Sequence, residues 1–513
     1  MHAVHSTTAG TFAADRSSIQ IEGGAPSDWL WLIAIFLALA AWTYLLPPIW
    51  NHGEAREGLV VQDIVHDHEW LLPDPNEGTP SKPPLYHWIA SLLALAFGLS
   101  DWTVRIPSAL AAGAIASMTF VLGKAIGGRR TGWLSVAALL GMYEFWVAGT
   151  EARVDTVFAS CVTASLTAFF FWQRDGSDWS RAMCYLAAGF AVLAKGPAGV
   201  AFPAIAIVTY LAVEKRLDRI LDLWSWRWIA LTLAMDVGWY AAAYHIGGSE
   251  FFKHQLLREN FDQVLGAHGF VSRHGKLVTF VWLATRVFPW NLALVCRLLH
   301  RLRGGREDST GRFLHAWWMT IFMIVFLSTI KRAVYLLPAY PAIALIAGRA
   351  MASIASEGVG GAASRIGAVV RQVAATPWRL AGTLAVIDLL LVIPNPSVWK
   401  RENSYSDMLA FVRQVDAAVP RTSPLSATPD LASTTQVVLA YRLQRNILKL
   451  PLSCGAAGDY FLIPAKDVPE TGLKVLATSA DDRTVLATGA SPLPTICQSE
   501  KRRLSENLQA DSD

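Results

Sequence analysis

The sequence predicts a polytopic, all-α membrane protein that carries a small α/β domain outside the bilayer. Of its 513 residues, 53% are hydrophobic and only 16% are charged, whereas about a quarter of the residues of a typical soluble protein are charged. Apolar runs near the roughly 20 residues that cross the hydrocarbon core recur from Trp29 to about Pro394. Beyond Pro394 the chain becomes polar, and short β-like runs alternate with turn residues.

About eleven apolar runs are long enough to be membrane crossings. They are residues 29–50, 106–123, 131–149, 156–173, 182–194, 196–213, 228–245, 277–296, 313–330, 333–348 and 380–394. The first run lacks a basic n-region and ends in Leu-Pro-Pro-Ile-Trp, so we expect a retained helix and not a cleaved signal peptide. Residues 1–27 then form a cytoplasmic tail, and residues 28–394 form the membrane domain.

The apolar run from Pro83 to Leu99 decides the topology, because counting it as a crossing would reverse the side of every later loop. Basic residues in short loops favour the cytoplasmic side. With this run in the interface, one set of loops carries 18 Lys and Arg residues and the opposite set carries 8. We therefore expect the run to lie in the interface, with the first long loop, 51–105, and the region after Pro394 facing outward.

The outward region after Pro394 is expected to form a separate α/β domain over residues 395–499, followed by a disordered, charged tail at 500–513. Its β-like runs cover residues 436–441, 460–463 and 473–478. Cys454 and Cys497 both fall in this domain. In an oxidising compartment they would either form a disulfide or remain free thiols.

Several function classes find no support in the sequence. The net charge of +4 does not indicate nucleic-acid binding, because the charges lie mostly in short loops between apolar runs, where they set topology. The chain has no Walker or dinucleotide-binding fingerprint, no Cys/His spacing of a zinc site and no convincing internal repeat. We therefore predict no cofactor, no metal site and no nucleic-acid partner, and find no motif for energy-coupled transport.

The first outer loop begins with Asn-His-Gly-Glu-Ala-Arg directly after a membrane helix and later reads Ser-Lys-Pro-Pro-Leu-Tyr. Glu54 lies beside a Trp-rich helix end, where a carboxylate can have a raised pKa and accept a proton. Arg56 and Lys82 carry charges that can hold phosphate oxygens. The three residues together suit a phosphorylated lipid. The alternative is that Glu54 and Arg56 are interfacial residues that pair with each other.

The second outer loop, 149–155, places Glu151, Arg153 and Asp155 between two apolar runs. Asp155 opens the next helix, where the dipole at the helix N-terminus favours the ionised carboxylate. A short solvated connection does not need three charges, so the loop is a candidate site. An intraloop salt bridge is the alternative.

Other charged and aromatic candidates lie further along the chain. Lys195 stands in Leu-Ala-Lys-Gly-Pro, a break too short for an ordinary loop, where a lysine either snorkels or binds an anion in a cavity. Lys331 and Arg332 lie on the side where basic residues are disfavoured, which favours phosphate binding over anchoring. His254 and Tyr335 are candidate contacts to acceptor or donor, although a lone histidine on an amphipathic helix is usually structural.

An ordered series of motifs runs through the membrane part of the chain. After the first helix come Glu-Ala-Arg, Asp-His-Glu-Trp-Leu-Leu-Pro, Lys-Pro-Pro-Leu-Tyr, Val-Arg-Ile-Pro-Ser-Ala-Leu, Arg-Val-Asp, Leu-Ala-Lys-Gly-Pro and Tyr-Leu-Leu-Pro-Ala-Tyr-Pro. From about Trp29 to Gly348 this series resembles the bacterial branch of the protein O-mannosyltransferase-like glycosyltransferases, which includes the aminoarabinose transferase that modifies lipid A. The ordered set is far more specific than any single motif.

The resemblance implies the GT-C architecture, with interfacial helices in the first outer loop and a periplasmic site that accepts a polyprenyl-phosphate sugar. Glu54 and Arg56 match the family's loop signature, Lys82 its Lys-Pro-Pro, Asp155 its second-loop acid and Lys195 its Lys-Gly. Two positions depart from the family. Gly53 stands where relatives commonly carry Asp, so either Glu54 or Asp155 takes the catalytic role. Ser81 stands where lipid A-type relatives often carry Glu, so a metal site borrowed from that Glu is not expected.

We therefore expect an inner-membrane glycosyltransferase, inverting at the sugar, that uses a polyprenyl-phosphate donor and a periplasmic acceptor such as lipid A or another envelope lipid, glycan or protein. Asp155 or Glu54 is the expected catalytic carboxylate. The expected ligands of the carrier phosphate are Arg56, Lys82, Lys195, Lys331 and Arg332. A transporter or flippase of lipid-linked sugars is the alternative. It needs polar residues at the bilayer midplane on broken helices, and Asp236, Arg286 and the break at Lys195 keep it open.

Overall fold

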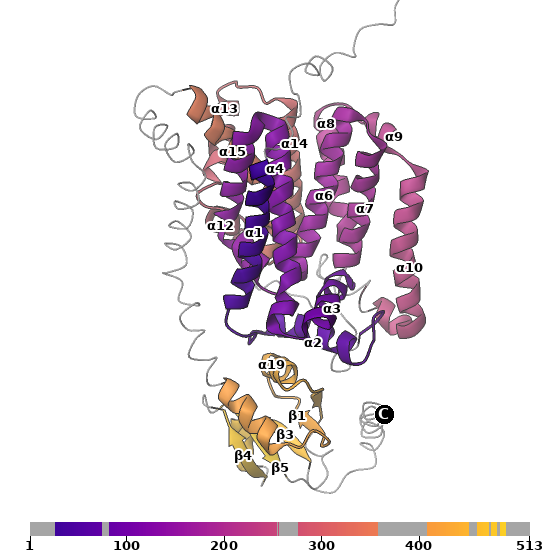
Figure 1. Ribbon diagram of the computed structural model, residues 1–513, viewed down its shortest axis with the longest axis vertical. Coiled ribbons are helices and arrows are strands. Elements are labelled where there is room, and N and C mark those ends of the chain that lie inside the picture. Colours follow the sequence, from indigo (N-terminus) through magenta and orange to yellow (C-terminus); the bar gives the residue numbers. More distant parts are fainter. Residues whose placement is uncertain are drawn as a thin grey trace, which may run out of the picture.

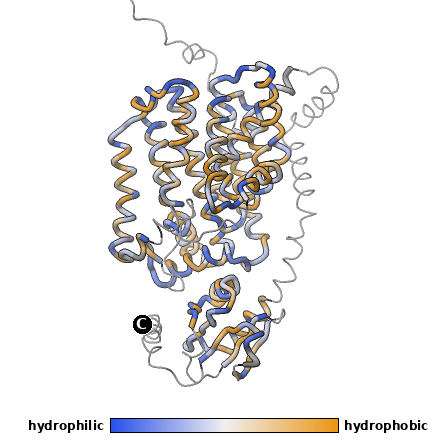
Figure 2. The backbone as a smooth tube through the Cα atoms, turned by 180° about the vertical axis from the view of Figure 1, so that it is seen from behind, coloured by the Kyte–Doolittle hydropathy of each residue, from blue (hydrophilic) through white to orange (hydrophobic). Residues whose placement is uncertain are grey.

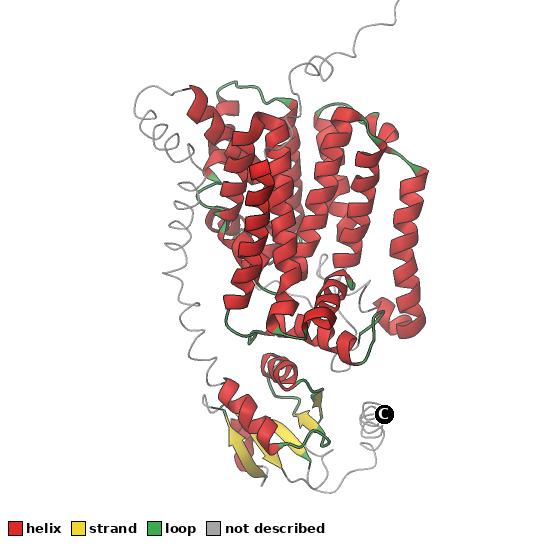
Figure 3. Cartoon of the chain, in the orientation of Figure 1, coloured by secondary structure: helices red, strands yellow, loops and turns green. Residues whose placement is uncertain are grey.

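A computed structural model describes residues 26–73, 82–253, 255, 275–357, 408–450, 459–470, 473–479 and 483–488. Several predictions fall outside this part of the chain: the crossing at 380–394, the candidate His254, the pair Cys454 and Cys497, and most of the two terminal tails. The described residues form a helical bundle with a small α/β domain at one end (Figures 1 and 3).

The bundle contains helices that agree with the predicted apolar runs. Five helical segments in the described part are long and apolar enough to cross a membrane: Ser27–Leu45, Asp101–Leu140, Val154–Asp175, Ser309–Leu327 and Ala333–Ser353. The helices are α1 (Pro26–Leu45), α4 (Asp101–Leu140), α6 (Val154–Asp175), α7 (Asp178–Lys195), α8 (Ala198–Val213), α10 (Trp226–Phe251), α14 (Ser309–Leu327) and α15 (Tyr340–Glu357), with α9 (Arg219–Leu223) as a short connection. Hydrophobic residues fill the length of the bundle and hydrophilic ones gather at its two ends (Figure 2).

Helix α4 holds the predicted crossing 106–123 and the first part of the predicted crossing 131–149, and it turns back on itself between them. Gly127 and Gly128 have non-helical backbone angles, and Gly128 takes a φ of +82°, which favours glycine. A Cβ atom on Gly123 would lie only 2.8 Å from the Cα of Gly132. The two halves of α4 therefore pack closely on either side of the glycine turn, as the separate runs 106–123 and 131–149 had predicted.

Three predicted runs are interrupted in the structure. The run 131–149 ends its first helix at Leu140, and α5 (Tyr143–Thr150) follows. The run 277–296 divides into α12 (Val278–Arg286) and α13 (Leu292–Leu302), with Pro289 between them. The run 333–348 starts as the 3₁₀ helix η4 (Ala333–Ala339) and continues as α15. In the second and third of these runs, prolines at 289, 338 and 341 lack the backbone N–H that a continuous helix needs. The first run contains no proline and breaks at Gly141 and Met142. Apolarity alone does not reveal such breaks.

The first outer loop contains two helices, α2 (His52–His66) and α3 (Leu85–Phe97), at the end of the bundle nearest the α/β domain (Figure 1). Asn51 caps α2, since its Oδ1 accepts a hydrogen bond from the Glu54 N–H at 2.9 Å. Helix α3 has 13 residues, so at 1.5 Å per residue it spans about 20 Å, less than the roughly 30 Å hydrocarbon core. Its length favours the predicted interfacial position.

The C-terminal domain is α/β, as predicted. Its sheet has the order β2-β1-β3-β5-β4, with β1 parallel to β2 and β3, and β5 antiparallel to β3 and β4. The strands are β1 (Leu425–Ala427), β2 (Leu448–Lys449), β3 (Tyr460–Pro464), β4 (Lys474–Thr478) and β5 (Thr484–Thr488), and the helical elements are a helix over 408–418, α19 (Ser433–Leu443) and η6 (Ala465–Glu470). The strand-like runs 460–463 and 473–478 are confirmed as β3 and β4.

The predicted strand at 436–441 is wrong, because these residues lie inside helix α19. The β-branched residues Val437 and Val438 favour strands, but a helix buries Val438, Leu439 and Tyr441 on the membrane domain and the sheet. Tertiary packing here outweighs local propensity. Helix α19 is also the part of the domain that rests on α2: the Gln62 amide donates a hydrogen bond to the Tyr441 carbonyl at 2.8 Å.

Candidate active site

A carboxylate and an ammonium group from two neighbouring helices lie in contact at one end of the bundle. Helix α6 begins at Val154 and puts Asp155 in its first turn, while α7 ends at Lys195, where Gly196 takes a φ of +75° and Pro197 follows. Both charges suit the local helix dipole. The Lys195 Nζ contacts the Asp155 Oδ1, and both side chains remain partly exposed, at 16% and 19%.

Tyr335 completes this group from a third segment. The Lys195 Nζ lies 3.9 Å from the centroid of the Tyr335 ring and 5.3 Å from that of Phe158. Such contacts stabilise an ammonium through the negative face of the ring. The site therefore brings together the start of α6, the end of α7 and η4, and it unites three residues that the sequence had nominated separately. Lys82, on the first outer loop, lies near enough to act electrostatically on Asp155.

Glu54 takes a different position from the one expected. Its side chain is 4% exposed, and its carboxylate accepts hydrogen bonds from Arg105 Nε at 2.7 Å and Nη2 at 3.0 Å. It also accepts from Asn51 Nδ2 at 2.7 Å and from the Ala152 N–H at 2.9 Å. Glu54 thus ties α2 to α4 and to the second outer loop. The alternative that Glu54 pairs with Arg56 is wrong, because Arg105 is its partner.

Arg56 pairs with the next residue, Glu57. The Arg56 Nη2 lies 2.6 Å from Glu57 Oε1, and the His87 Nε2 lies 2.8 Å from Glu57 Oε2. Burial raises the pKa of the Glu57 carboxyl, but Arg56 and His87 outweigh burial and hold that pKa well below its usual range. Arg56 keeps a partly exposed side chain, 38%, so it remains accessible to an anion.

In the second outer loop, the alternative of an intraloop salt bridge is confirmed for Glu151 and Arg153. Asp155 is not part of that salt bridge. The Arg153 Nη2 lies 2.6 Å from Glu151 Oε2. The Arg153 N–H donates to the Ser108 hydroxyl at 3.0 Å, which fixes the loop on α4. Glu151 and Arg153 thereby satisfy one another, and Asp155 is left to pair with Lys195 across helices.

The remaining predicted cations lie just before η4. Lys331 is buried and contacts the Ser328 carbonyl oxygen, and burial together with the charge of Lys276 lowers its pKa. Arg332 is exposed. Burial lowers the pKa of His52, and the charges of Arg56 and Arg332 lower it further, so these two arginines share one neighbourhood. Within the described ranges, no three His, Cys, Asp or Glu residues gather as metal ligands.

Sequence reasoning missed Arg105, Glu57 and His87. Arg105 lies in the quoted Val-Arg-Ile-Pro-Ser-Ala-Leu motif, and a buried arginine one turn into an apolar helix is a signal for a carboxylate partner. Glu57 and His87 carried no such signal, because their contact joins two helices that are separated by a long loop. Only the packing of α2 on α3 brings them together.

Comparison with known proteins agrees with this architecture. Residues 81–239 match the family described as dolichyl-phosphate-mannose-protein mannosyltransferase. A protein of Shewanella sediminis named undecaprenyl phosphate-alpha-4-amino-4-deoxy-L-arabinose arabinosyl transferase is 25% identical over 317 residues, which cover 59% of this chain and 56% of that protein. A protein of the same name from Pseudomonas savastanoi pv. phaseolicola is 26% identical over 376 residues, or 70% of this chain and 68% of the relative. The chain thus spans little more than half the length of the Shewanella relative.

The fold is also similar to a solved structure. The crystal structure of ArnT from Cupriavidus metallidurans bound to undecaprenyl phosphate superimposes with a TM-score of 0.76 at 16% identity, covering 91% of this chain and all of that one. This likeness confirms the predicted GT-C fold with its C-terminal α/β domain. The chain resembles GT-C glycosyltransferases of the lipid A aminoarabinose transferase kind, and its apolar helices indicate a multi-pass inner-membrane protein.

Proposed function

We propose that this multi-pass membrane chain, similar to the aminoarabinose transferases, is an inverting glycosyltransferase that moves a sugar from a polyprenyl-phosphate donor to an acceptor on the periplasmic side. The observation that carries the proposal is the meeting of Asp155, Lys195 and Tyr335 at one end of the bundle. A carboxylate and a partly exposed ammonium, oriented by a ring, are the groups that such a transfer requires.

In this mechanism Lys195 binds the carrier phosphate. An ammonium has three N–H donors, so Lys195 can donate to Asp155 and to a phosphate oxygen at the same time. Lys82 and Arg56 from the first outer loop, with Lys331 and Arg332 from the segment before η4, are the other proposed phosphate ligands. Their charges stabilise the lipid phosphate as it leaves, because negative charge develops on the oxygen that had been bonded to the sugar.

Asp155 is the proposed catalytic carboxylate. An acceptor oxygen attacks the anomeric carbon, the bond from that carbon to the phosphate oxygen breaks, and the phosphate leaves with the polyprenyl chain. If the acceptor is a hydroxyl, Asp155 takes its proton; if the acceptor is itself a phosphate, Asp155 orients it. Glu54 is the second candidate for this role. We assign it instead to positioning, since four hydrogen bonds occupy its carboxylate.

The periplasmic orientation rests on charge. Basic residues are concentrated in the loops at the opposite end of the bundle from Asp155, and such loops favour the cytoplasm. The acceptor we propose is lipid A or another envelope lipid, glycan or protein. The named relatives point to an undecaprenyl-phosphate donor.

Donor turnover tests the proposal. The protein is reconstituted in vesicles with radiolabelled polyprenyl-phosphate sugar and an envelope lipid extract. Transfer of label to the extract, with release of polyprenyl phosphate, is the expected result. Translocation of intact donor without turnover would instead establish the transporter alternative. Mass spectrometry of envelope lipids and glycans from a deletion strain then identifies the sugar and the acceptor together.

A further inference from the structure

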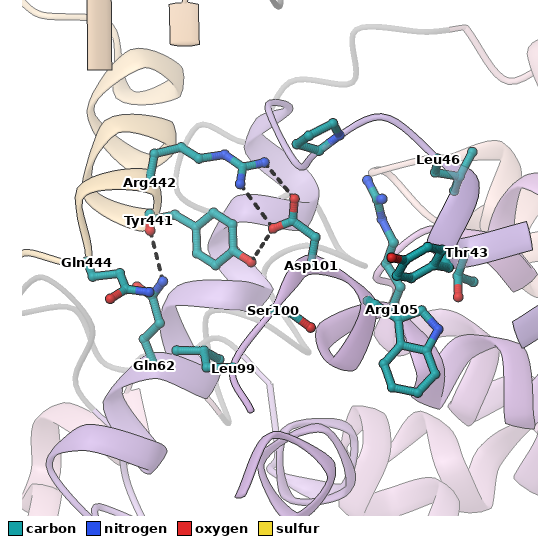
Figure 4. Close-up of a pocket in the computed structure, with 13 residues that line it drawn as sticks. Thr43, Leu46, Gln62, Leu99, Ser100, Asp101, Arg105, Tyr441, Arg442 and Gln444 are labelled. Atoms are coloured by element: carbon teal, nitrogen blue, oxygen red, sulfur yellow. Dashed lines mark hydrogen bonds and ion pairs between the residues drawn. The ribbon is translucent and has the colours of Figure 1, made fainter. Parts of the chain in front are cut away.

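A cavity of about 390 Å³ lies at the seam between the membrane domain and the C-terminal domain (Figure 4). Its walls come from the end of α1, from α2, from the start of α4 and from α19. Asp101 lies between the α19 side chains Tyr441 and Arg442 on one side and Arg105 with Leu46 on the other (Figure 4). The volume falls in the range of roughly 300–1,000 Å³ that small-molecule sites occupy.

The charges in the cavity wall neutralise one another. Asp101 accepts hydrogen bonds from the Tyr441 hydroxyl at 2.8 Å and from Arg442 Nη2 at 2.8 Å. Arg105 is held by Glu54 through two hydrogen bonds. Glu54 does not itself line the cavity, but with it two carboxylates balance the two arginines of the wall. The cavity therefore does not favour a bare phosphate over a neutral ligand. The carrier-phosphate cations named above do not line it.

The rest of the lining combines aromatic rings with uncharged polar groups. Tyr44 and Trp102 contribute rings, Gln62 and Gln444 contribute amides, and Thr43 and Ser100 contribute hydroxyls. The face of a pyranose ring carries C–H groups that pack on aromatic rings, and its rim carries hydroxyls that bond to amides and hydroxyls. A saccharide uses both kinds of group at once, which a lipid chain or an inorganic ion cannot do.

The position of the cavity suits a ligand held in the membrane. Tyr44 and Leu45 at the end of the membrane span α1 are 74% and 73% exposed, as expected for side chains at a lipid boundary. A headgroup could occupy the cavity while its acyl chains stay in the bilayer. Hydrogen bonds also connect the cavity wall to the candidate active site. Arg105 in the wall donates to Glu54, and Glu54 accepts the N–H of Ala152, which lies three residues before Asp155.

From these contacts we infer that the seam cavity binds the saccharide part of the acceptor. This inference rests on the transferase function proposed above. The occupant is either the headgroup of a glycolipid or a free glycan with the same ring chemistry. The ligand touches residues of both domains, so the C-terminal domain takes part in acceptor recognition.

Hydroxyl-radical footprinting of the full-length protein in nanodiscs tests the inference. The modification rates of Tyr44 and Trp102 are measured by mass spectrometry with three probes: lipid A, its deacylated disaccharide, and phosphatidylglycerol as a lipid without sugar. Protection by lipid A and by the disaccharide means that the ring chemistry alone is recognised. Protection by lipid A alone means that a membrane-linked headgroup is required. Either result supports the inference, whereas no protection by either sugar, or equal protection by phosphatidylglycerol, overturns it.

Substitutions at two neighbouring positions serve as test variant and matched control. Leu46→Trp fills the cavity from a loop position that lines it, and Leu45→Trp adds the same ring to an exposed position outside it. Leu46→Trp should abolish the protection and raise the KM for the acceptor about tenfold or more, equivalent to about 1.4 kcal/mol, while Leu45→Trp should match wild type. Undiminished protection in Leu46→Trp would overturn the inference.

Donor turnover measured on the same samples separates this inference from the proposed function. Normal turnover without saccharide protection overturns the cavity assignment alone. Protection without any turnover contradicts the transferase function, and with it the role of the cavity in acceptor binding.

Discussion

Arg105 donates two hydrogen bonds to the Glu54 carboxylate, from Nε at 2.7 Å and from Nη2 at 3.0 Å. The same carboxylate accepts a hydrogen bond from the Ala152 N–H at 2.9 Å. One buried ion pair thereby joins the first outer loop, the start of α4 and the loop that carries Asp155. The geometry divides two carboxylates that look equivalent in the sequence: Glu54 joins three segments of the chain, and Asp155 pairs with Lys195, where we propose that it acts on the acceptor.

Glu54→Ala should destabilise the protein strongly, because it leaves Arg105 buried without its partner. Removing one member of a buried ion pair costs about 3–5 kcal/mol, so the unfolding midpoint in nanodiscs should fall clearly. Asp222→Asn, which breaks the half-exposed pair with Arg219, is the control and should cost less than about 1 kcal/mol. Equal stability of Glu54→Ala and the control would contradict the structural role of Glu54.

Tyr335→Leu should weaken donor binding, because the ring that lies 3.9 Å from the Lys195 ammonium is lost. A cation–π contact contributes roughly 1 kcal/mol, which corresponds to a KM for the donor raised about fivefold. Tyr335→Phe keeps the ring and should stay near the wild-type KM. An equal rise of the donor KM in both variants would show that the Tyr335 hydroxyl, and not its ring, contributes to donor binding.

Glu57 should make the stability of the outer loop depend on pH. Its pKa is lowered in the folded protein from the ordinary 4.5, so its contribution is present above pH 4.5 and is lost as the pH falls from there toward the folded pKa. The difference in unfolding midpoint between wild type and Glu57→Gln should therefore be largest near pH 7 and shrink below about pH 4.5. A difference that does not change with pH would show that Glu57 acts by packing alone.

Arg442→Ala should loosen the C-terminal domain from the membrane domain. Arg442 bonds to Asp101 at 2.8 Å and to the Ile49 carbonyl oxygen, and its side chain is only 16% exposed. Hydrogen exchange should rise in α19 and in the first turns of α2 and α4, with the strands β3 and β5 unchanged. Lys466→Ala, at an exposed residue of the same domain, is the control. Unchanged exchange in α19 would mean that other contacts hold the seam.

Much of this fold could be predicted from the sequence, because apolar length and basic-loop asymmetry are strong constraints in a bilayer. The helix breaks at Pro289 and Pro338 and the helix at 433–443 were not predicted, since they depend on packing that apolarity does not record. Asp155, Lys195 and Tyr335 were each nominated from local context. Their contact could not be predicted, because it depends on α6 and α7 lying side by side with η4 packed beside them.

The partner of Glu54 shows the same limit. Arg56, two residues away, was the natural candidate from sequence distance, but residues two positions apart on a helix do not face each other. Arg56 pairs with Glu57, and Glu54 pairs with Arg105. A charge inside an apolar run, such as Arg105, is the kind of signal that could have corrected this.

The most direct test of the account is the transfer activity of Asp155→Asn in reconstituted vesicles. The control is Asp178→Asn, because Asp178 begins α7 and lies at the end of that helix opposite to Lys195. Loss of a general base or acceptor-orienting carboxylate should lower the turnover by about a hundredfold or more, while polyprenyl phosphate still binds, because Lys195 is retained. Asp178→Asn should keep wild-type turnover. Full activity of Asp155→Asn would contradict the assignment of this carboxylate to the reaction.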